Sequence, residues 1–472
     1  MIRCLARLAL AAALAPSLAV AAPPQTPPSP AAQAAARGDK AMDAGKYPEA
    51  ERAYGDAIKL APGAAEYRAD RGEAYRLGGD DKAAIDDLDA AIKADATQAW
   101  YHVARGRAFD DLGAQAEARA DFDAALAIDP KDQAAFYFRA VLRAAGGDDS
   151  GGLADIQRAV ALRPDDAEAI EARGDIYSDM KRYDDALSDF AASLKIDPRN
   201  HDALSGRAGV YYAQEDWPAA ATYYDAALAV YPNDARLHAL RGKVSARLKQ
   251  PGRATAEFAT ALRLDPKDTD AMYDRGYWEE DQQRYDDAIA DFTAITRLKP
   301  DAGDAWQALG EAYIDKGDFR RALAACDAGL KRAPKDAGLL IDHGRANWGL
   351  RQGDAARADY DAALAINPKD DAGLYDRALV LAAQGHNDRA IRDLDAALAI
   401  TPGDAQTLEE RGEIYLYLDD YLRAVSDLTA AIAADPRYGE AYRHRAAAWR
   451  KLGDEARAQA DDAKASALAS GA

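Results

Sequence analysis

The sequence is poor in several residue types, and each shortage narrows the classes of protein to which it can belong. It contains two cysteines and six histidines in 472 residues. Cys4 lies in the first thirty residues, which leaves Cys326 as the single cysteine of the main body. One thiol cannot form an intrachain disulfide, so we expect Cys326 to be buried as a small apolar side chain.

Positive charge is also in deficit. There are 60 Lys and Arg against 80 Asp and Glu, which gives a formal net charge of −20. Binding to nucleic acid or to an anionic membrane surface requires a dominant basic surface, so we expect neither as the main partner. Beyond the first 21 residues no apolar run is long enough to span a bilayer, so we expect no integral membrane segment.

Motifs that carry chemistry are missing as well. The sequence has no Gly-rich phosphate loop, no G-x-S-x-G nucleophile motif and no H-E-x-x-H zinc motif. Its histidines are scattered without metal-ligand spacing: His102, His201, His238, His343, His386 and His444. We therefore expect no catalysis by the chain itself, no cofactor and no metal.

What the sequence has in abundance is a repeat of 34 residues, most visible in its prolines. Ten prolines follow one another at intervals of 34 residues: Pro130, Pro164, Pro198, Pro232, Pro266, Pro300, Pro334, Pro368, Pro402 and Pro436. Pro62 is in phase with them, and Ala96 replaces the proline at the intervening position. Residues 31–472 divide into 13 units without insertion, starting at 31, 65, 99, 133, 167, 201, 235, 269, 303, 337, 371, 405 and 439. Such a period is typical of a solenoid built from tandem units.

Within each unit the residue types predict two antiparallel helices. Position 8 is Gly or Ala in all 13 units, for example Gly174, and position 20 is Ala in all but one, for example Ala186. Gly costs roughly 1 kcal/mol in a helix interior, so its recurrence indicates close approach of the facing helix. Position 24 is mostly large and apolar, as at Phe190, and should fill the space between neighbouring units. The proline at position 32 ends the second helix.

This pattern of small, small, aromatic and proline at a 34-residue period resembles the tetratricopeptide repeat family. The resemblance covers residues 31–472. It implies an all-α fold, a right-handed α-solenoid (superhelix) of tandem antiparallel helix pairs. It also implies a concave face built from positions 2, 5, 9, 12 and 13 of each first helix, where a protein or peptide partner binds.

One departure from the family pattern concerns charge. Position 7 is Arg in eleven units and position 23 is acidic in ten, whereas unit nine has Leu309 and Ala325 and lacks both. Charged side chains that enter a helix interface are normally paired. We therefore expect a partly buried ladder of Arg–carboxylate pairs between first and second helices, in preference to a basic track for a ligand.

The N-terminus has the features of a secretory signal peptide. Arg3 and Arg7 precede an apolar run of 13 residues, and small residues end at Ala21. A membrane anchor is the alternative, but the run is too short to span. We expect residues 1–21 to be a signal peptide, 22–30 a Pro-rich tether, and the mature protein to be exported, to a bacterial periplasm.

Unit seven is the strongest candidate for partner binding. It carries eight Lys or Arg against three acidic residues, and Arg236, Lys243 and Arg247 occupy positions 2, 9 and 13. The neighbouring units offer Tyr212, Tyr273 and Tyr277. This combination suits a peptide with acidic and apolar residues, or an acidic glycan. The alternative is intramolecular pairing of the stripe with the acidic unit eight.

Two weaker clusters occupy other concave positions. Ile341, Arg345, Trp348 and Tyr375 lie in units ten and eleven, and Trp100 and Tyr137 lie in units three and four, where packing is the alternative. Our leading hypothesis is a non-catalytic periplasmic scaffold that holds a protein partner in its concave groove. The rival hypothesis is an accessory protein that binds cell-wall or exported polysaccharide, and a third is a subunit of an enzyme complex.

Overall fold

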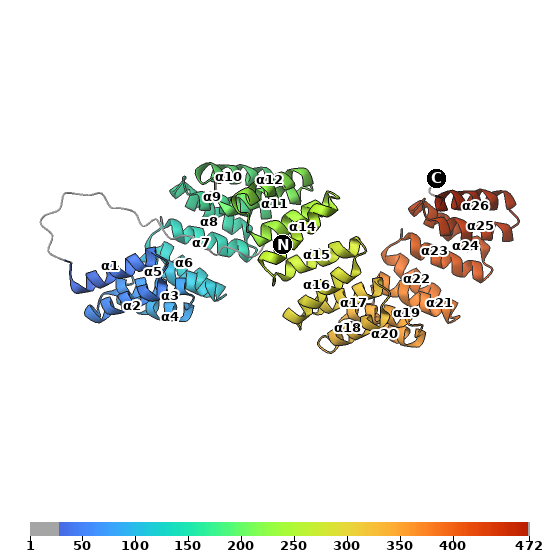
Figure 1. Cartoon of the computed structure of the whole chain (residues 1–472), viewed down its shortest axis with the longest axis horizontal. Helices are drawn as coiled ribbons and strands as arrows, with labels where there is room; N and C mark the ends of the chain where they lie inside the picture. The colour runs from blue at the N-terminus through green and yellow to red at the C-terminus, as the bar shows by residue number, and fades with distance from the viewer. Residues whose placement is uncertain (1–27, 471–472) are drawn as a thin grey trace. The chain divides into compact units, whose positions relative to one another are not determined.

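Residues 28–470 are described by a computed structural model, and within them the fold is entirely helical, with 26 helices (Figure 1). The predicted signal peptide and most of the predicted tether lie outside these residues. The chain divides into two compact units, with the boundary between Lys249 and Gln250. Antiparallel helix pairs run from α1 to α12 in the first unit and from α15 to α26 in the second, so the predicted all-α solenoid of helix pairs is confirmed.

The first unit contains thirteen helices among its described residues. They are α1 (Pro30–Asp43), α2 (Tyr47–Leu60), α3 (Ala65–Gly78), α4 (Asp81–Ala94), α5 (Ala99–Asp111), α6 (Gln115–Ile128), α7 (Gln133–Ala145), α8 (Asp149–Leu162), α9 (Ala167–Asp179), α10 (Tyr183–Ile196), α11 (His201–Ala213), α12 (Trp217–Val230) and α13 (Ala235–Arg247).

The second unit likewise contains thirteen helices up to residue 470. They are α14 (Pro251–Leu264), α15 (Thr269–Asp281), α16 (Tyr285–Leu298), α17 (Gly303–Asp315), α18 (Phe319–Leu330), α19 (Ala337–Gly349), α20 (Gly353–Ile366), α21 (Asp371–Ala383), α22 (Asn387–Ile400), α23 (Ala405–Tyr417), α24 (Tyr421–Ala434), α25 (Gly439–Lys451) and α26 (Glu455–Ala469).

Helix ends are specified by short polar side chains and by left-handed loop residues. The residue before many first helices is Asp, and its carboxylate caps the helix, as when Asp166 accepts a hydrogen bond from the Ala169 amide at 3.0 Å. Each loop between paired helices contains one residue with positive φ. Glycine fills this place in seven of the thirteen loops within residues 28–470, and residues such as Lys181 (φ 59°) fill the other six.

The core of each repeat depends on the small residue at position 8. A Cβ atom added to Gly174 would lie 2.8 Å from Phe190, and one added to Gly206 of the next repeat would lie 2.7 Å from the same ring. Phe190 is fully buried between them. This confirms both predictions, that position 8 permits close approach and that position 24 fills the space between repeats. Cys326 takes the same place in repeat nine and is a buried free thiol, as expected.

The predicted charge ladder is present and partly buried. In eight repeats the position 7 arginine forms two parallel hydrogen bonds with the position 23 aspartate, as in Arg173 to Asp189, both at 2.7 Å. The eight pairs are Arg71–Asp87, Arg105–Asp121, Arg139–Asp155, Arg173–Asp189, Arg275–Asp291, Arg377–Asp393, Arg411–Asp427 and Arg445–Asp461. These arginines are therefore structural.

Repeats ten and six show how the ladder tolerates substitution. In repeat ten His343 replaces the arginine and lies between Asp359 (2.8 Å) and Asp327 (3.6 Å). In repeat six Arg207 meets the hydroxyl of Tyr223 at 3.0 Å instead of a carboxylate. Leu309 and Ala325 of repeat nine are both buried, so an apolar contact replaces the ion pair there.

Candidate functional site

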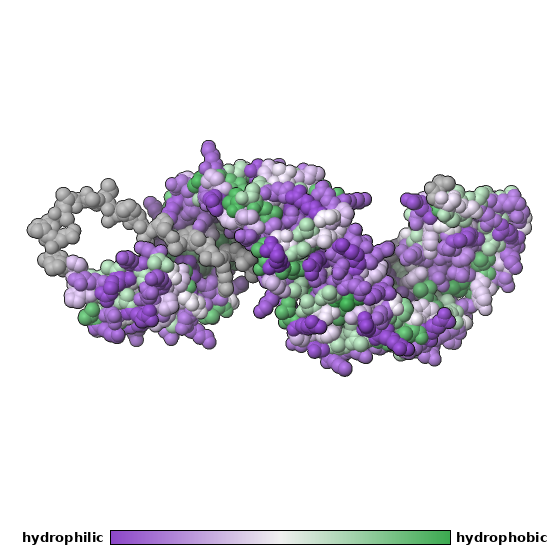
Figure 2. Space-filling model, viewed as in Figure 1, coloured by the Kyte–Doolittle hydropathy of each residue, from purple (hydrophilic) through white to green (hydrophobic). Residues whose placement is uncertain are grey.

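Many first helices of neighbouring repeats contact one another within each unit, and their outward sides form a shared surface. Such contacts join α3 to α5, α5 to α7, α7 to α9 and α9 to α11 in the first unit, and α17 to α19, α19 to α21 and α23 to α25 in the second. We call this surface the inner face. The surface visible in Figure 2 is largely hydrophilic, with small hydrophobic patches.

Internal ion pairs compensate part of the negative charge of the inner face at α3 and α5. Arg76 of α3 donates to Glu73 at 2.8 Å and to Asp111 of α5 at 3.1 Å. Arg107 of α5 reaches back to Glu73 at 3.1 Å. Two arginines therefore pair with Glu73 and Asp111, whereas the same part of the face also carries the acidic residues Glu66, Asp70 and Asp110.

Further along the first unit, α9 presents a pair of carboxyl groups one helical turn apart. Glu171 and Asp175 share a hydrogen bond, and burial raises the pKa of Glu171 well above its ordinary value and that of Asp175 to about 7. The nearby Asp202 carboxylate adds to both shifts, whereas the Arg236 guanidinium opposes the rise at Asp175. The pair therefore holds a proton near neutral pH.

The predicted basic stripe of α13 has partners inside the first unit. Arg236 is exposed and close enough to Asp175 to influence its pKa. Arg247 lies over the ring of Trp217 at 5.9 Å, and Trp217 meets Tyr212 edge-on at 5.0 Å. Lys243 is half-buried. Tyr273 and Tyr277, which we grouped with the stripe from sequence, belong to the second unit.

The inner face of the second unit is strongly acidic from α15 to α23, whereas α25 carries Arg443, Arg450 and Lys451 at the same positions. On α15, α17, α19, α21 and α23, repeat positions 2, 5, 6, 9, 12 and 13 hold one basic residue, Arg345, and twelve acidic ones. The acidic residues are Asp270, Asp274, Glu280, Asp281, Asp304, Glu311, Asp315, Asp342, Asp376, Glu409, Glu410 and Glu413. We call this surface the acidic inner face.

Several of these carboxyl groups are buried without enough compensating charge. Burial raises the pKa of Glu280 to about 7, with Asp315 and Glu311 adding to the shift. Burial and the Glu311 carboxylate raise the pKa of Asp342 to about 8, against the opposing effect of Arg345. Among residues 28–470, Oε1 of Glu280 and Oδ2 of Asp342 are buried and accept no hydrogen bond. The face is thus electrostatically under-compensated.

Aromatic side chains border the acidic inner face. Tyr273 and Tyr277 of α15 stack with ring centroids 6.2 Å apart and planes inclined by 16°, and Tyr277 remains 47 % exposed. Burial raises the pKa of Tyr277 to about 12, and the nearest carboxylates, led by Glu311, add to this. Tyr277 therefore offers an apolar ring surrounded by negative charge.

The second predicted cluster is divided between core and surface. Ile341 is 5 % exposed and packs in the core. Arg345 is paired with Asp376 at 2.7 Å and with Asp342 at 3.3 Å. Trp348 is 38 % exposed, and Tyr375 is half-buried. Arg345 and Trp348 thus lie at the surface, whereas Ile341 contributes packing.

The third predicted cluster lies in the first unit and is also partly packed. Trp100 is 38 % exposed and meets Tyr101 edge-on, with ring centroids 4.5 Å apart. Tyr137 is half-buried and meets Phe138 edge-on at 5.1 Å. Of this cluster, Trp100 presents the larger exposed surface.

Family models described as tetratricopeptide repeats match most of the helical region, at residues 35–99, 101–132, 177–244, 240–302, 273–337 and 341–405. The chain belongs to the tetratricopeptide repeat family. Proteins built from tetratricopeptide repeats generally act as scaffolds for other proteins. A search of curated proteins with this sequence finds no match.

Solved structures of tetratricopeptide repeat proteins are similar to this chain. The APC/C hetero-tetramer Cut9-Hcn1 shares 13 % identity, with 93 % of this chain and 94 % of that chain covered and a TM-score of 0.46. Yeast Tom70 shares 16 % identity over 90 % of this chain and 99 % of its own, with a TM-score of 0.40. YrrB, a TPR protein with an unusual peptide-binding site, shares 24 % identity over 39 % and 95 %, with a TM-score of 0.33. At these identities the likeness concerns the fold alone.

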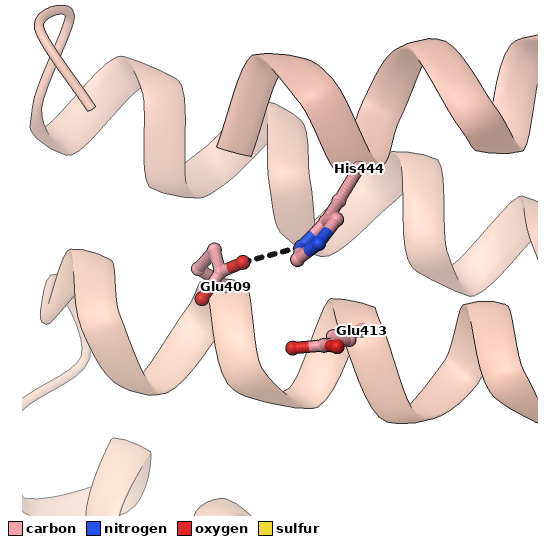
Figure 3. Close-up of side chains that lie close together, drawn as sticks. All are labelled: Glu409, Glu413 and His444. Carbon is pink, nitrogen blue, oxygen red and sulfur yellow. Dashed lines mark hydrogen bonds and ion pairs between the residues drawn. The ribbon is translucent and has the colours of Figure 1, made fainter. Parts of the chain in front are cut away.

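The last two tetratricopeptide repeats bring together three polar side chains that sequence reasoning did not connect (Figure 3). Glu409 and Glu413 lie one turn apart on α23, and His444 faces them from α25. Nδ1 of His444 lies 2.5 Å from Oε1 of Glu409. The repeat register could have predicted this contact. Position 6 of one repeat meets positions 5 and 9 of the preceding repeat, as Asp376 at position 6 meets Arg345 at position 9.

Proposed function

We propose that this tetratricopeptide repeat protein is a non-catalytic scaffold of the bacterial periplasm that holds a basic, extended segment of a partner protein on the acidic inner face. The observation that carries the proposal is that the acidic inner face has twelve acidic residues and one arginine. In addition, one buried carboxylate oxygen of Glu280 and one of Asp342 accept no hydrogen bond. Lys and Arg side chains of a partner supply such donors and the missing positive charge.

Partner chemistry follows from the contrast between two parts of the same fold. At equivalent positions of α3 and α5, two arginines stand against five acidic residues, and Arg76 pairs with Asp111. On the acidic inner face Arg345 is the single basic residue at these positions. Burying unpaired carboxyl groups is unfavourable, so an electropositive ligand gains more there than on α3 and α5. The exposed Tyr277 ring adds a contact for an apolar or cationic side chain of the same segment.

The acidic inner face supports binding better than catalysis. Its carboxyl groups are distributed along five helices, and the G-x-S-x-G nucleophile motif does not occur in the sequence. The only cysteine among residues 28–470, Cys326, is buried, and burial raises the pKa of its thiol. A thiol in this state is a poor nucleophile.

Export to the periplasm is supported by the N-terminal sequence. Arg3 and Arg7, the short apolar run and the small residues before Ala22 have the order of a signal peptide. Among residues 28–470, no helix is both long enough and apolar enough to cross a membrane. Fractionation of a bacterial host that expresses the full gene tests this. We expect a periplasmic form whose N-terminal residue is Ala22, and an uncleaved cytoplasmic form would contradict it.

Partner binding is tested with two labelled peptides of identical length, one alternating Lys and Leu and the other alternating Glu and Leu. We expect fluorescence anisotropy to show binding of the basic peptide only, weakening as salt rises. The triple variant Glu280→Gln, Glu311→Gln and Asp315→Asn should weaken it by about tenfold or more, since it removes three acidic groups from one stretch of the face. Circular dichroism checks that the variant remains helical.

The matched comparison is the charge reversal Arg236→Glu, Lys243→Glu and Arg247→Glu on α13, which should leave binding of the basic peptide intact. If the wild type binds the acidic peptide and the charge reversal on α13 abolishes that binding, α13 is the binding centre and the proposal is contradicted. Retention of cell-wall glycan with neither peptide bound would favour the polysaccharide-binding hypothesis.

A further inference from the structure

We propose that Glu409, Glu413 and His444 form a binding site for a first-row divalent transition metal ion, with Zn²⁺ as the best-suited ion, that joins the last two repeats. Each residue contributes one ligand atom, and these atoms all lie within 4.8 Å of one another. Glu409 and Glu413 also belong to the acidic inner face, but ion binding depends on three fixed side chains and not on the overall charge of that face.

The two helices present these side chains from rigid elements. Glu409 and Glu413 are four residues apart, which places both carboxylates on the same side of α23. His444 approaches from α25, and α23 and α25 are in direct contact. The Tyr438 hydroxyl donates to Oε2 of Glu409 at 3.2 Å, which leaves Oε1 directed at His444. A supporting hydrogen bond of this kind orients metal ligands in proteins.

The ligand types select the ion. Two carboxylates balance the charge of a divalent cation, and an imidazole nitrogen favours Zn²⁺ and its neighbours over Mg²⁺ and Ca²⁺, which prefer oxygen ligands. Glu409 is buried whereas Glu413 is exposed, so the ion would have protein on one side and water on the other. Three protein ligands with an open position is an arrangement that Zn²⁺ accepts.

Two other places in the chain resemble the site but lack one requirement. Glu171 and Asp175 have the same spacing on α9, but the residue that corresponds to His444 in the next repeat is Gly206. His343 lies between two aspartates, but Asp359 contacts Nδ1 and Asp327 contacts Nε2. The two nitrogens of one ring point in different directions, so those carboxylates cannot converge on one ion. These two places serve as internal comparisons.

The test is isothermal titration of the full chain, without a polyhistidine tag, with ZnCl₂, followed by thermal denaturation with and without the metal. We expect one Zn²⁺ per chain and a rise in the unfolding midpoint, because an ion bound only by the folded state stabilises it. Excess Mg²⁺ should not displace Zn²⁺. Replacing Zn²⁺ with Co²⁺ should give visible absorption bands that report ligation directly.

Variants decide whether these residues hold the ion. His444→Gln should abolish binding, and Glu413→Gln, which alters an exposed side chain and should not disturb folding, should weaken it by about tenfold or more. His343→Gln and the pair Glu171→Gln, Asp175→Asn should bind as the wild type does. Absence of binding by the wild type, or unchanged stoichiometry and affinity in both His444→Gln and Glu413→Gln, would overturn the proposal.

Discussion

The guanidinium group of Arg411 is joined to the carboxylate of Asp427 by two parallel hydrogen bonds, from Nε to Oδ2 at 2.7 Å and from Nη2 to Oδ1 at 2.9 Å. Its third nitrogen, Nη1, donates to Asp395 of the preceding repeat at 2.6 Å. One arginine therefore ties α23 to α24 and to α22. The same pair of parallel hydrogen bonds recurs in eight repeats, where the ladder joins the first helix to the second.

Removing one partner of this pair should cost more than removing both. Arg411→Leu leaves the buried Asp427 carboxylate without its cation, and we expect a loss of about 3 kcal/mol in unfolding free energy, measured by urea denaturation. The double variant Arg411→Leu, Asp427→Ala copies Leu309 and Ala325 of repeat nine and should recover most of that loss. A double variant that is less stable than the single one would show that the pair itself is strongly stabilising.

The contact between Gly174 and Phe190 predicts that one methyl group is too large at this position. Gly174→Ala would place a Cβ 2.8 Å from the buried ring and should destabilise the fold by about 1–3 kcal/mol, despite the better helix propensity of Ala. Gly209 on α11 is the control, since a Cβ there meets no atom within 4 Å. Gly209→Ala should stabilise the protein by about 1 kcal/mol. Equal effects of the two variants in chemical denaturation would contradict this account of the packing.

The loop residue Lys181 adopts a left-handed backbone conformation, with φ of 59°, that residues other than glycine rarely adopt. Lys181→Gly should remove this strain, and we expect a gain of up to about 1 kcal/mol after the greater flexibility of the unfolded chain is subtracted. Gly147 has φ of 85° at the equivalent place, so Gly147→Ala should have the opposite effect. The comparison is made by thermal denaturation of both variants, and a gain from Gly147→Ala would refute it.

The buried Asp342 predicts a pH dependence of stability. Its pKa is about 8 in the folded chain against an ordinary value of 3.8, so the folded chain holds a proton that the unfolded chain has lost. Its contribution to unfolding free energy therefore falls as pH rises from about 4 to about 8 and is constant above that. Asp342→Asn should raise stability by at least about 1 kcal/mol at pH 8.5, and by less at pH 5.

Asp301 provides the control for this pH series, because its carboxylate is 96 % exposed. Asp301→Asn should change the unfolding midpoint little between pH 5 and pH 8.5. If the gain from Asp342→Asn is the same at both pH values, the carboxyl group is not the one that titrates in this range.

Interactions that recur with the period could be predicted from the sequence because the period itself places them. Position 7 lies 16 residues from position 23 in every repeat, so pairs such as Arg173–Asp189 follow from the spacing of the two helices. Contacts between repeats were harder to anticipate. The meeting of Glu409 with His444 depends on which inner positions of successive first helices touch, and the spacing of ligands along the chain carries no local motif for it.

The sequence by itself determined the helix pairs, their number, the small residues at their contacts and the arginine ladder, since these follow from residue size, charge and a strict 34-residue register. Only the tertiary structure decided which charges remain uncompensated. Arg76 and Arg107 pair with Glu73 and Asp111 on α3 and α5, whereas the carboxyl groups near Asp342 have too few cations within reach. Net composition cannot distinguish these cases, because electrostatic energy depends on distance and burial in three dimensions.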